Sequence, residues 1–345
     1  MDFEDDLNEE WLKYLNVSDS IPVMKDTSKP VIKETRIDRH ITPPECSPIV
    51  ISTKTKIVYL NSGIDLFERF WDMPMISYDL FQEGVIKKQI RFNFQNKEEV
   101  EVFEERIKEQ PFPTVVRILN KIDNPNGRVQ FKDIRKVDVG ISKNDLIKSK
   151  KKDKGDTKSA FYNCFVFIYR IKFQGIFKEV HVKLFNSGKF EIPGIQDESI
   201  VDIIVKCVIE LLQPHYKDVV LQEKRDMRET ILINSNFKCN YYINREELFN
   251  ILKTKYNIKC SYDPCSYPGI QCKYKLPNIY VSFMIFRTGS VLIVGKCNDE
   301  QLYMIYDFIK QIFYDEINSI YENDTEEQAK KNKKKIKRVI QIHSE

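Results

Sequence analysis

The chain has 345 residues, of which 42% are hydrophobic and 12% aromatic, which is too much apolar surface for a disordered chain and enough for one large or two ordinary domains. The formal net charge of +4 is too small to indicate a nucleic-acid partner by itself, so the placement of charge has to decide. The eight cysteines are scattered without a secretory signal, and no apolar run reaches the roughly 18 residues that span a bilayer, so we expect an intracellular, reducing compartment.

The chain opens with an acidic segment, "MDFEDDLNEEWL", and the residues up to about 45 mix Pro, Ser and charge with little periodicity. We therefore expect a mobile acidic arm over residues 1–45. Two basic runs follow, "KSKKKDKGDTKSA" from Lys148 to Ala160 and "AKKNKKKIKR" from Ala329 to Arg338, and the second predicts a basic tail over residues 319–345. Each run is as often a solvated face as a binding surface, so these runs do not identify a partner.

Two stretches of the chain are similar to each other. "LFNSGKFEIPG" (Leu184–Gly194) and "IFRTGSVLIVG" (Ile285–Gly295) align at an offset of 101 residues, and each is followed without a gap by an amphipathic helical pattern. Upstream, "IVISTKTKIVYLNSGIDLF" (Ile49–Phe67) and "ILINSNFKCNYYINREELF" (Ile231–Phe249) align at an offset of 182. A unit of strand, helix, antiparallel strands and long helix therefore occurs twice.

The two units differ in length. Their two offsets differ by 81 residues, which predicts about eighty extra residues in the first unit, at about 85–160. Within them, "NKEEVEVFEERIKEQPFPTVVRILN" indicates an added helix and strand. The predicted domains are thus a first unit over residues 46–217, which holds the insertion, and a second unit over residues 218–318.

Two such units can join their sheets edge to edge, which removes one exposed edge from each, while both long helices cover one face. Alternation in the hairpins assigns the helix-facing residues: Val182, Leu184, Phe190, Ile192, Val281, Phe283, Ile285, Val291 and Ile293. The residues predicted to point outward are Lys183, Phe185, Lys189, Glu191, Ser282, Met284, Phe286, Ser290, Leu292 and Val294. An open apolar face of this kind marks a partner surface, unless the phases are swapped or the insertion covers it.

Several local strings resemble a known family. They are "YDPCSYPG" (Tyr262–Gly269), "MIFRTGSVLIVGKC" (Met284–Cys297) and "KLFNSGKFEIPG" (Lys183–Gly194). Their doubled order resembles the TATA-binding protein (TBP) family, in a divergent form similar to the TBP-like proteins of large DNA viruses. The resemblance implies an α+β fold, a TBP-like saddle of two pseudo-repeats with a curved antiparallel sheet and helices on the convex face, plus an insertion in repeat one.

The resemblance also implies how the protein works. Members of this family bind the minor groove of double-stranded DNA with the concave sheet, and apolar side chains wedge between base steps and kink the duplex. Phe185 and Phe286 match one wedge position in each repeat, and Tyr267 matches the second wedge of repeat two. Asn234 fills the position of an amide that reads base edges. The further DNA-binding residues expected on this face are Lys183, Lys189, Met284, Ser290, Leu292 and Val294.

The sequence departs from the family pattern in ways that weaken base readout. The counterpart of the reading amide in repeat one is Ser52 or Ile49 rather than Asn, and Glu191 points a carboxylate at an anionic groove unless Lys183 or Lys189 pairs with it. With fewer polar readers, specificity rests on how easily the DNA deforms. We therefore expect A/T-rich or easily bent DNA as the partner rather than a strict TATA sequence.

Two aromatic residues are candidates for the second wedge of repeat one, namely Phe81 and Phe165. Of the acidic residues that recruit a bridging factor in the family, Asp263 remains in "YDPCSYPG". The resemblance therefore implies a general transcription initiation factor, active in the nucleus or a cytoplasmic viral factory, which recruits an initiation factor bridging to RNA polymerase. The alternative is a protein–protein scaffold of the same fold in a transcription or virion complex, without DNA binding.

Metal binding and catalysis lack support in the sequence. Cys260, Cys265 and Cys272, together with Cys239, do not have the paired C-x2-C spacing of zinc knuckles, and no His lies nearby. There is no Gly-rich phosphate loop, HExxH motif or nucleophile elbow. We expect neither an enzyme nor a cofactor, a metal, a membrane or a small-molecule substrate.

Overall fold

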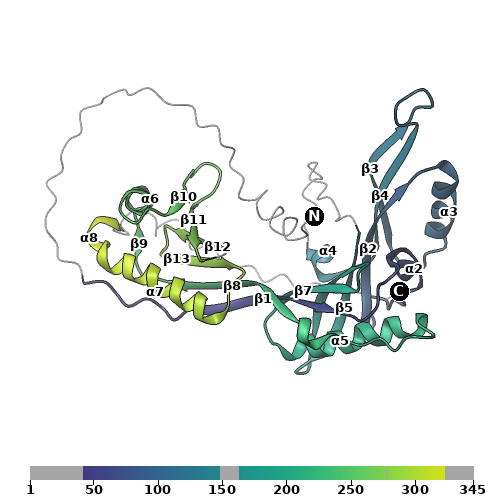
Figure 1. Ribbon diagram of the computed structural model, residues 1–345, viewed down its shortest axis with the longest axis horizontal. Coiled ribbons are helices and arrows are strands. Elements are labelled where there is room, and N and C mark those ends of the chain that lie inside the picture. Colours follow the sequence, from purple (N-terminus) through teal and green to yellow (C-terminus); the bar gives the residue numbers. More distant parts are fainter. Residues whose placement is uncertain (1–41, 148–162, 278, 323–345) are drawn as a thin grey trace. The chain divides into compact units, whose positions relative to one another are not determined.

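The structure is a computed structural model that describes residues 42–147, 163–277 and 279–322. The predicted acidic arm up to residue 41, the Lys-rich run and the chain beyond residue 322 lie outside these ranges. Within them, the α+β class predicted from the sequence is confirmed, because helices accompany a twelve-stranded antiparallel sheet (Figure 1).

The elements of the first half, up to the end of the first long helix, include eleven strands and helices. They are β1 (Val50–Tyr59), α2 (Leu66–Asp72), β2 (Gly84–Phe94), α3 (Lys97–Lys108), β3 (Thr114–Asp123), β4 (Phe131–Gly140), α4 (Lys143–Ile147), β5 (Cys164–Phe173), β6 (Ile176–Phe185), β7 (Lys189–Ile195) and α5 (Ser199–Leu212). Short 3₁₀ turns at Gln213–His215 and Arg225–Met227 lead into the second half.

The second half continues the same sheet. Its elements are β8 (Glu229–Lys238), β9 (Tyr242–Ile243), α6 (Arg245–Thr254), β10 (Lys259–Ser261), β11 (Gly269–Lys275), β12 (Tyr280–Phe286), β13 (Ser290–Gly295), α7 (Asp299–Asp315), α8 (Ile317–Ile320) and β14 (Tyr321–Glu322). Asn side chains start three of the helices: Asn96 caps α3, Asn244 caps α6, and Asn298 forms a capping box with Gln301 at α7.

The strand order places the two halves side by side in one sheet. It runs β10-β11-β12-β13-β8-β1-β7-β6-β5-β2-β4-β3, and β14 pairs separately with β9. The halves meet where β1 pairs antiparallel with β8, for example Thr53 with Asn234 and Ile57 with Glu229. Read outward from that pair, β8, β13, β12, β11 and β10 correspond in order to β1, β7, β6, β5 and β2. Beyond β2 the first half adds β4 and β3 at the sheet edge.

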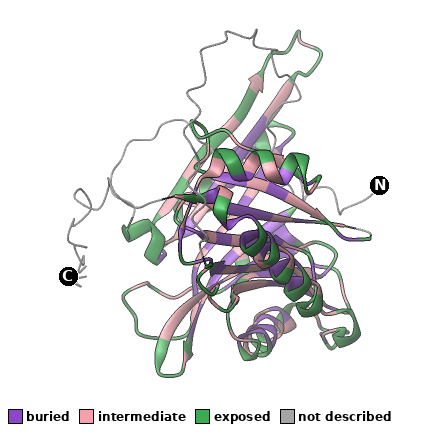
Figure 2. Cartoon of the chain, turned by 90° about the vertical axis from the view of Figure 1, so that its left-hand side faces the viewer, coloured by how far each residue is buried: buried purple, intermediate pink, exposed green. Residues whose placement is uncertain are grey.

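Two separate hydrophobic clusters join the strands to the helices. Figure 2 shows buried residues both on the strands and on the helices. The nine residues that alternation assigned to the helices are all at most 1% exposed and are divided between these clusters. The chain just before and at the start of β1 packs against the cluster of the second half, through Cys46, Ile49 and Ile51. Ser47 also exchanges backbone hydrogen bonds there, since its N–H donates to Lys238 and its carbonyl accepts from the Tyr306 hydroxyl.

The insertion extends the sheet. The helix and strand predicted from "NKEEVEVFEERIKEQPFPTVVRILN" are α3 and β3, whereas β4 and α4 were not predicted. Because β4 pairs with β2 on one side and β3 on the other, these two strands continue the sheet beyond β2. The side chains of α3 that face the sheet, Val100 and Phe103, join the core of the first half.

The ammonium group of Lys88 is buried at the end of α2. Its Nζ donates to the carbonyls of Trp71 and Met73, both at 3.4 Å, and lies 5.0 Å from the centre of the Phe70 ring. Burial lowers the pKa of this lysine to about 8. The side chain is therefore charged in the folded protein only below that pH, whereas in the unfolded chain it stays charged up to its ordinary pKa near 10.4.

We expect Lys88 to make the stability of the protein depend on pH in the alkaline range. Between about pH 8 and pH 10 the unfolded chain binds more protons than the folded chain, so the free energy of unfolding rises with pH by about 1–3 kcal/mol from this group. Urea unfolding at pH 7.5 and pH 10 should show that rise in wild type relative to Lys88→Met. Equal pH dependence of the two proteins would contradict the assignment.

Candidate nucleic-acid interface

The face of the sheet opposite the helices carries the predicted outward residues. In the second half, Met284 pairs with Leu292, and Val294 pairs with Asn234 on β8. None of the residues predicted to point outward belongs to either hydrophobic cluster. Leu292 and Ser290 are half-buried, whereas Met284 and Val294 are buried although they lie outside the clusters. The outward phase predicted for both hairpins is therefore correct.

Phe286 and Tyr267 meet at one corner of this face. Phe286 ends β12 and pairs with Gly269, and its ring centre lies 5.9 Å from that of Tyr267, with the planes inclined by 59°. The Tyr267 hydroxyl donates to the Met284 sulfur at 3.4 Å, and partial burial raises the pKa of this tyrosine. A Cβ at Gly269 would lie 3.0 Å from both rings, so glycine is what lets the two aromatic residues approach.

The turn residues between Tyr262 and Gly269 hold Tyr267 in place. The Asp263 carbonyl accepts from the Tyr267 N–H at 2.9 Å, and its carboxylate accepts from the Cys265 N–H at 3.0 Å. Hydrogen bonds lower the pKa of the exposed Asp263 carboxyl, and the largest contribution comes from Ser266. The carboxylate predicted to recruit a partner is therefore exposed and ionised at neutral pH, on the loop that carries the aromatic residue.

Phe185 occupies the corresponding corner of the first half. It ends β6 and pairs with Cys164, as Phe286 ends β12 and pairs with Gly269. The same turn follows both phenylalanines, because the N–H of Gly188 donates to the Phe185 carbonyl at 3.0 Å and that of Gly289 to the Phe286 carbonyl at 2.9 Å. Lys189 lies over the Phe185 ring, with its Nζ 4.7 Å from the centre.

The glycines of these turns are required by their backbone conformation. Gly188 and Gly289 have φ angles of +80° and +75°, and a Cβ would lie 2.2 Å from the Ser62 carbonyl oxygen at the first and 2.3 Å from the Tyr241 carbonyl oxygen at the second. Any other residue would be strained and would collide with backbone. The turn residues in the two similar hairpins thus fix the two phenylalanines in equivalent places.

The Glu191 carboxylate forms an ion pair with Lys183, one of the two lysines that the sequence analysis named as its partner. Its Oε1 accepts from Lys183 Nζ at 3.0 Å and the residue is 3% exposed, so the carboxylate is largely withdrawn from the surface. Lys189, the other lysine considered as its partner, lies over Phe185 instead. Within the described part of the chain the Glu191 Oε2 atom is buried without a hydrogen-bond partner. The unfavourable charge facing the sheet surface is therefore neutralised by Lys183.

A second amide adjoins Asn234. Asn234 is half-buried between Val294 on β13 and Thr53 on β1. Two residues further along the same face of β8, the Asn236 side chain donates to the Ser52 hydroxyl at 2.6 Å. A bulge between Ile51 and Thr53 brings Ser52 to that amide. The period-two pattern of β8 could have indicated Asn236, which the sequence analysis did not select.

Of the two candidates for the second wedge of repeat one, the structure excludes Phe165. Phe165 is fully buried in the core and packs against the Phe70 ring, 5.7 Å between centres, so it cannot reach a ligand. Phe81 is 87% exposed, on the loop before β2. That loop is held by Arg170, whose guanidinium donates to the carbonyls of Tyr78, Leu80 and Gln82. Phe81 thus lies in the loop between α2 and β2, away from the turn after Phe185.

The insertion covers one end of the outward face. The backbone N–H of Lys143, at the start of α4, donates to both carboxylate oxygens of Glu179 on β6, at 3.0 and 3.1 Å. Asp145 forms an ion pair of 2.8 Å with Lys87 on β2. His181, beside Glu179, is largely desolvated, which lowers its pKa. The expectation of a bare face is therefore wrong at the α4 end.

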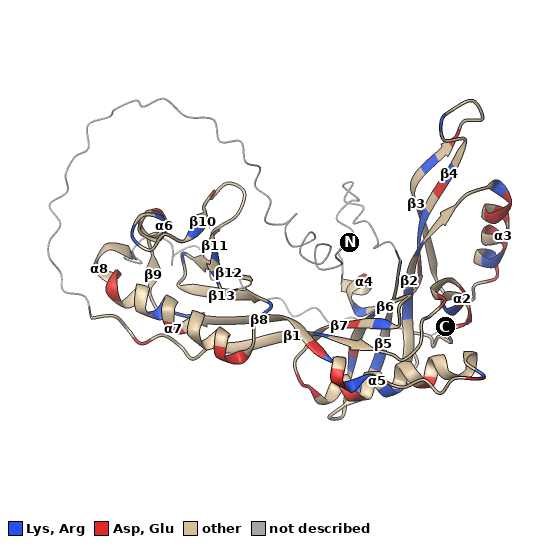
Figure 3. Ribbon diagram, viewed as in Figure 1, with Lys and Arg blue, Asp and Glu red and all other residues tan. Residues whose placement is uncertain are grey.

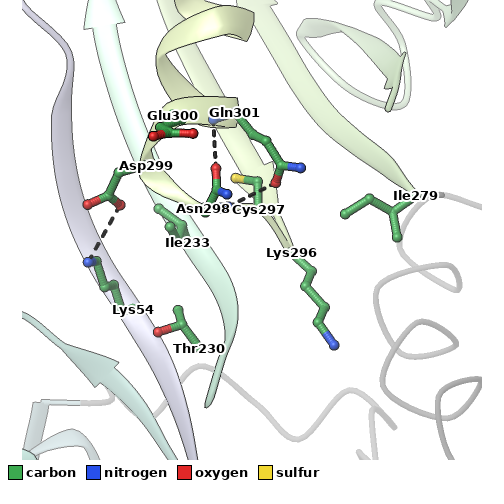
Figure 4. A pocket seen from close by; sticks show the side chains of 10 residues that line it. All are labelled: Lys54, Thr230, Ile233, Ile279, Lys296, Cys297, Asn298, Asp299, Glu300 and Gln301. Carbon is green, nitrogen blue, oxygen red and sulfur yellow. Dashed lines mark hydrogen bonds and ion pairs between the residues drawn. The ribbon is translucent and has the colours of Figure 1, made fainter. Parts of the chain in front are cut away.

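A polar pocket lies elsewhere, at the start of α7 (Figure 4). Its side chains mostly satisfy one another, because Asn298 and Gln301 form the capping box and Lys54 Nζ lies 3.7 Å from Asp299. Among the residues that the structure describes, no three His, Cys, Asp or Glu side chains are grouped as metal ligands. No helix in the described ranges is long and apolar enough to cross a membrane.

Comparison with known proteins finds similarity to one family. Residues 233–315 match the family described as "Transcription factor TFIID (or TATA-binding protein, TBP)". A "TATA-box-binding protein-like" protein of Acanthamoeba polyphaga mimivirus is 27% identical over 190 residues, which are 48% of this chain and 51% of the relative, so the chain spans about half the length of that relative. The solved structure of Methanococcus jannaschii TBP aligns with 79% of this chain and 99% of its own, at 14% identity and a TM-score of 0.42. The resemblance to a divergent, viral TBP-like protein is thereby confirmed.

Proposed function

We propose that this TBP-like chain is a general transcription initiation factor that binds double-stranded DNA in the minor groove and bends it. The observation that carries the proposal is the pair of equivalent corners at Phe185 and Phe286. In each corner a phenylalanine ends a strand on the face opposite the core, just before the same glycine turn. A ring at the end of a strand can enter between base pairs edge-on, which unstacks one step and kinks the duplex.

The register of the strands supplies a candidate for the missing second wedge. Tyr267 lies two residues before Gly269, the partner of Phe286, and the equivalent position before Cys164, the partner of Phe185, is Tyr162. Tyr162 lies outside the described residues. We propose Phe185 with Tyr162 and Phe286 with Tyr267 as the two wedge pairs of repeats that span residues 46–217 and 218–318.

Sequence preference in this proposal comes mainly from DNA deformability. The amides of Asn234 and Asn236 are the polar groups available to read base edges, and the minor groove distinguishes A·T from G·C but hardly A·T from T·A. Lys183 offsets the charge of Glu191, while Lys189 remains beside Phe185 to face phosphates. A/T-rich or easily bent duplexes are therefore the proposed ligands. Met284, Ser290, Leu292 and Val294 would form the apolar floor against the sugars.

The proposed protein partner is an initiation factor that bridges to RNA polymerase and contacts the loop of Asp263. The exposed carboxylate there is suited to a basic surface. The proposed place of action is the nucleus or a cytoplasmic viral factory, and the basic tail and Lys-rich run would add contacts to DNA or to the same machinery. The function needs neither a cofactor nor catalysis.

The proposal predicts salt-dependent binding to short duplexes. Anisotropy of a labelled A/T-rich duplex should rise with the full chain at nanomolar to micromolar concentration, and the affinity should fall steeply as salt rises, because bound lysines and arginines release counterions from phosphates. A G/C-rich duplex of the same length should bind more weakly and bend less. Absence of binding to either duplex at low salt would contradict DNA binding.

A protein–protein scaffold without DNA binding is the second candidate. The observation that favours it is α4, which occupies one end of the face that would otherwise meet DNA, through its contacts with Glu179 and Lys87. In that case the exposed corners would receive side chains of a protein partner. The binding experiment above separates the two candidates, since only the first predicts a salt-dependent complex with bare duplex.

A further inference from the structure

Two thiols face each other across the outermost pair of strands in the second half. Cys260 on β10 is directly opposed to Cys272 on β11, in a register that also pairs Lys259 with Lys273. Directly opposed residues of antiparallel strands have Cα atoms about 4.5–5.5 Å apart, which lies within the range of about 4.4–6.8 Å that a disulfide spans. Both cysteines are free thiols in the structure, so the register places them ready for a bond that has not formed.

The two side chains lie on the same side of the sheet. Cys272 is 2% exposed and belongs to the core of the second half, and the half-buried Cys260 packs against that core. Within the described chain, β10 is the last strand at this edge of the sheet. The pair therefore combines a buried thiol with one that a small reagent can reach from the sheet edge.

The surroundings make Cys260 the more reactive of the two thiols. A hydrogen bond from Cys272 is the main cause that lowers the pKa of Cys260, and the ammonium group of Lys253 on α6 acts in the same direction against the effect of burial. Figure 3 shows basic residues on both α6 and β10. Burial raises the pKa of Cys272. Because the thiolate is the attacking species in thiol–disulfide exchange, Cys260 is suited to attack first and Cys272 to follow.

The segment between the two thiols is the loop that carries Asp263 and Tyr267. This loop connects the end of β10 to the start of β11, so Cys260 and Cys272 stand on either side of its base. Its described internal hydrogen bonds are local, such as that from the Tyr267 N–H to the Asp263 carbonyl. The three residues of β10 are a short attachment at a sheet edge, where strands open most easily. A covalent bond across the base would remove that freedom.

We propose that Cys260 and Cys272 form a reversible disulfide that clamps the base of the loop carrying Asp263 and Tyr267. In the first step the Cys260 thiolate attacks a small disulfide, such as oxidised glutathione, which gives a mixed disulfide and releases one small thiolate. Cys272 then loses its proton to that thiolate, and its sulfur attacks the Cys260 sulfur and expels the second small thiolate, which takes a proton from water. Two protein thiols and one small disulfide thus become one protein disulfide and two small thiols. An excess of the reduced small thiol reverses the exchange.

The clamp also has a consequence for DNA, which rests on the proposed function, whereas the disulfide itself does not. Tyr267 already lies against Phe286, with ring centres 5.9 Å apart, so a closed loop base holds it in the place proposed for the second wedge. A side chain that is ordered before binding costs less to immobilise in the complex. The oxidised protein should therefore release an A/T-rich duplex about 2- to 12-fold more slowly than the reduced protein.

The first test locates the bond. The full chain is incubated with mixtures of reduced and oxidised glutathione, quenched with acid, and alkylated before and after reduction with two reagents of different mass. Wild type should lose two of its eight thiols, and the second reagent should label Cys260 and Cys272. Cys260→Ser, at the sheet edge, should abolish the bond, as should Cys272→Ser in the core.

Cys265→Ser is the matched control, because Cys265 is an exposed thiol in the same loop and the variant should oxidise as wild type does. Second-reagent labelling of Cys265 in place of Cys260 or Cys272 would overturn the assignment of the pair. Full retention of the Cys260 and Cys272 thiols in excess oxidised glutathione would overturn the disulfide altogether.

Hydrogen exchange and DNA release test the clamp. Backbone amides of residues 262–267 should exchange more slowly in oxidised than in reduced wild type, and Cys260→Ser should show no difference between the two conditions. Equal exchange in both forms of wild type would overturn the clamp, and equal rates of duplex release would overturn its consequence for DNA. Failure of both forms to bind duplex would overturn the proposed function instead, while the disulfide and its effect on the loop would still be measured.

Discussion

Phe286→Ala is expected to weaken binding to an A/T-rich duplex about 5- to 150-fold and to reduce the bend angle. The ring lies outside the second core and its described ring contact is with Tyr267, so the substitution removes the proposed wedge while leaving the packing beneath the sheet intact. Stacking of a base on an aromatic side chain contributes about 1–3 kcal/mol, which corresponds to that range of affinity. Energy transfer between dyes at the duplex ends measures the bend.

The two corners should act together. Phe185→Ala should have an effect similar to Phe286→Ala, and the double variant should bind with little bending, because no phenyl ring would remain at the end of β6 or β12. Tyr314→Ala is the matched control, since Tyr314 is an exposed aromatic residue on α7 and should tolerate truncation without loss of binding. Wild-type bending by the double variant would show that the phenylalanines are not wedges, even if DNA binding itself persisted.

Arg135→Met is expected to lower the free energy of unfolding by about 3–5 kcal/mol, because it leaves a buried charge without its partner. Two nitrogens of Arg135 donate to the two carboxylate oxygens of Asp133, at 3.0 and 2.8 Å, and a third donates to Glu104 on α3 at 2.8 Å. Asp133 is fully buried. The pair and Glu104 raise the pKa of the guanidinium, so Arg135 stays charged wherever the protein is folded.

The double variant Asp133→Leu/Arg135→Met distinguishes a broken pair from lost packing. Replacing both charges by apolar side chains of similar size removes the unpaired carboxylate, so the double variant should recover most of the lost stability. Urea unfolding followed by circular dichroism measures both. If the double variant were as unstable as Arg135→Met, the packing of the arginine stem against Phe103 and α3 would be the main contribution, rather than the charge pair.

The sequence was most informative where structure is local. Alternation and the two glycine turns predicted which residues of the hairpins face the core. The prediction depended on the exact register, because a shift of one residue would have moved every side chain to the other face. The pattern of "NKEEVEVFEERIKEQPFPTVVRILN" similarly indicated α3. The pairing of Arg91 with Lys136, and of Lys136 with Arg117, joins strands whose register depends on loops and bulges rather than on any local pattern. The register of these strands could therefore not be predicted from the sequence.

Two other features were hidden for different reasons. The five residues of α4 are too few to show a helical period, so its position over Glu179 and Lys87 left no signal in the sequence. Phe165 follows the same alternation as any strand aromatic, and only the register with Leu184 shows that it faces the core. The wedge candidates were accessible to prediction because a repeated hairpin identified them twice.

The stretch around Cys46, Ile49 and Ile51 has a consequence for how the protein is made. These residues pack against the core built by the second half of the chain, so that core is completed by a segment synthesised nearly two hundred residues earlier. During translation β1 is synthesised before β8. The edge of β1 that pairs with β8 therefore has no partner strand until the ribosome has passed Lys238. Completion of the second core is therefore tied to a segment of the first half, and the second half produced alone would lack part of its interior.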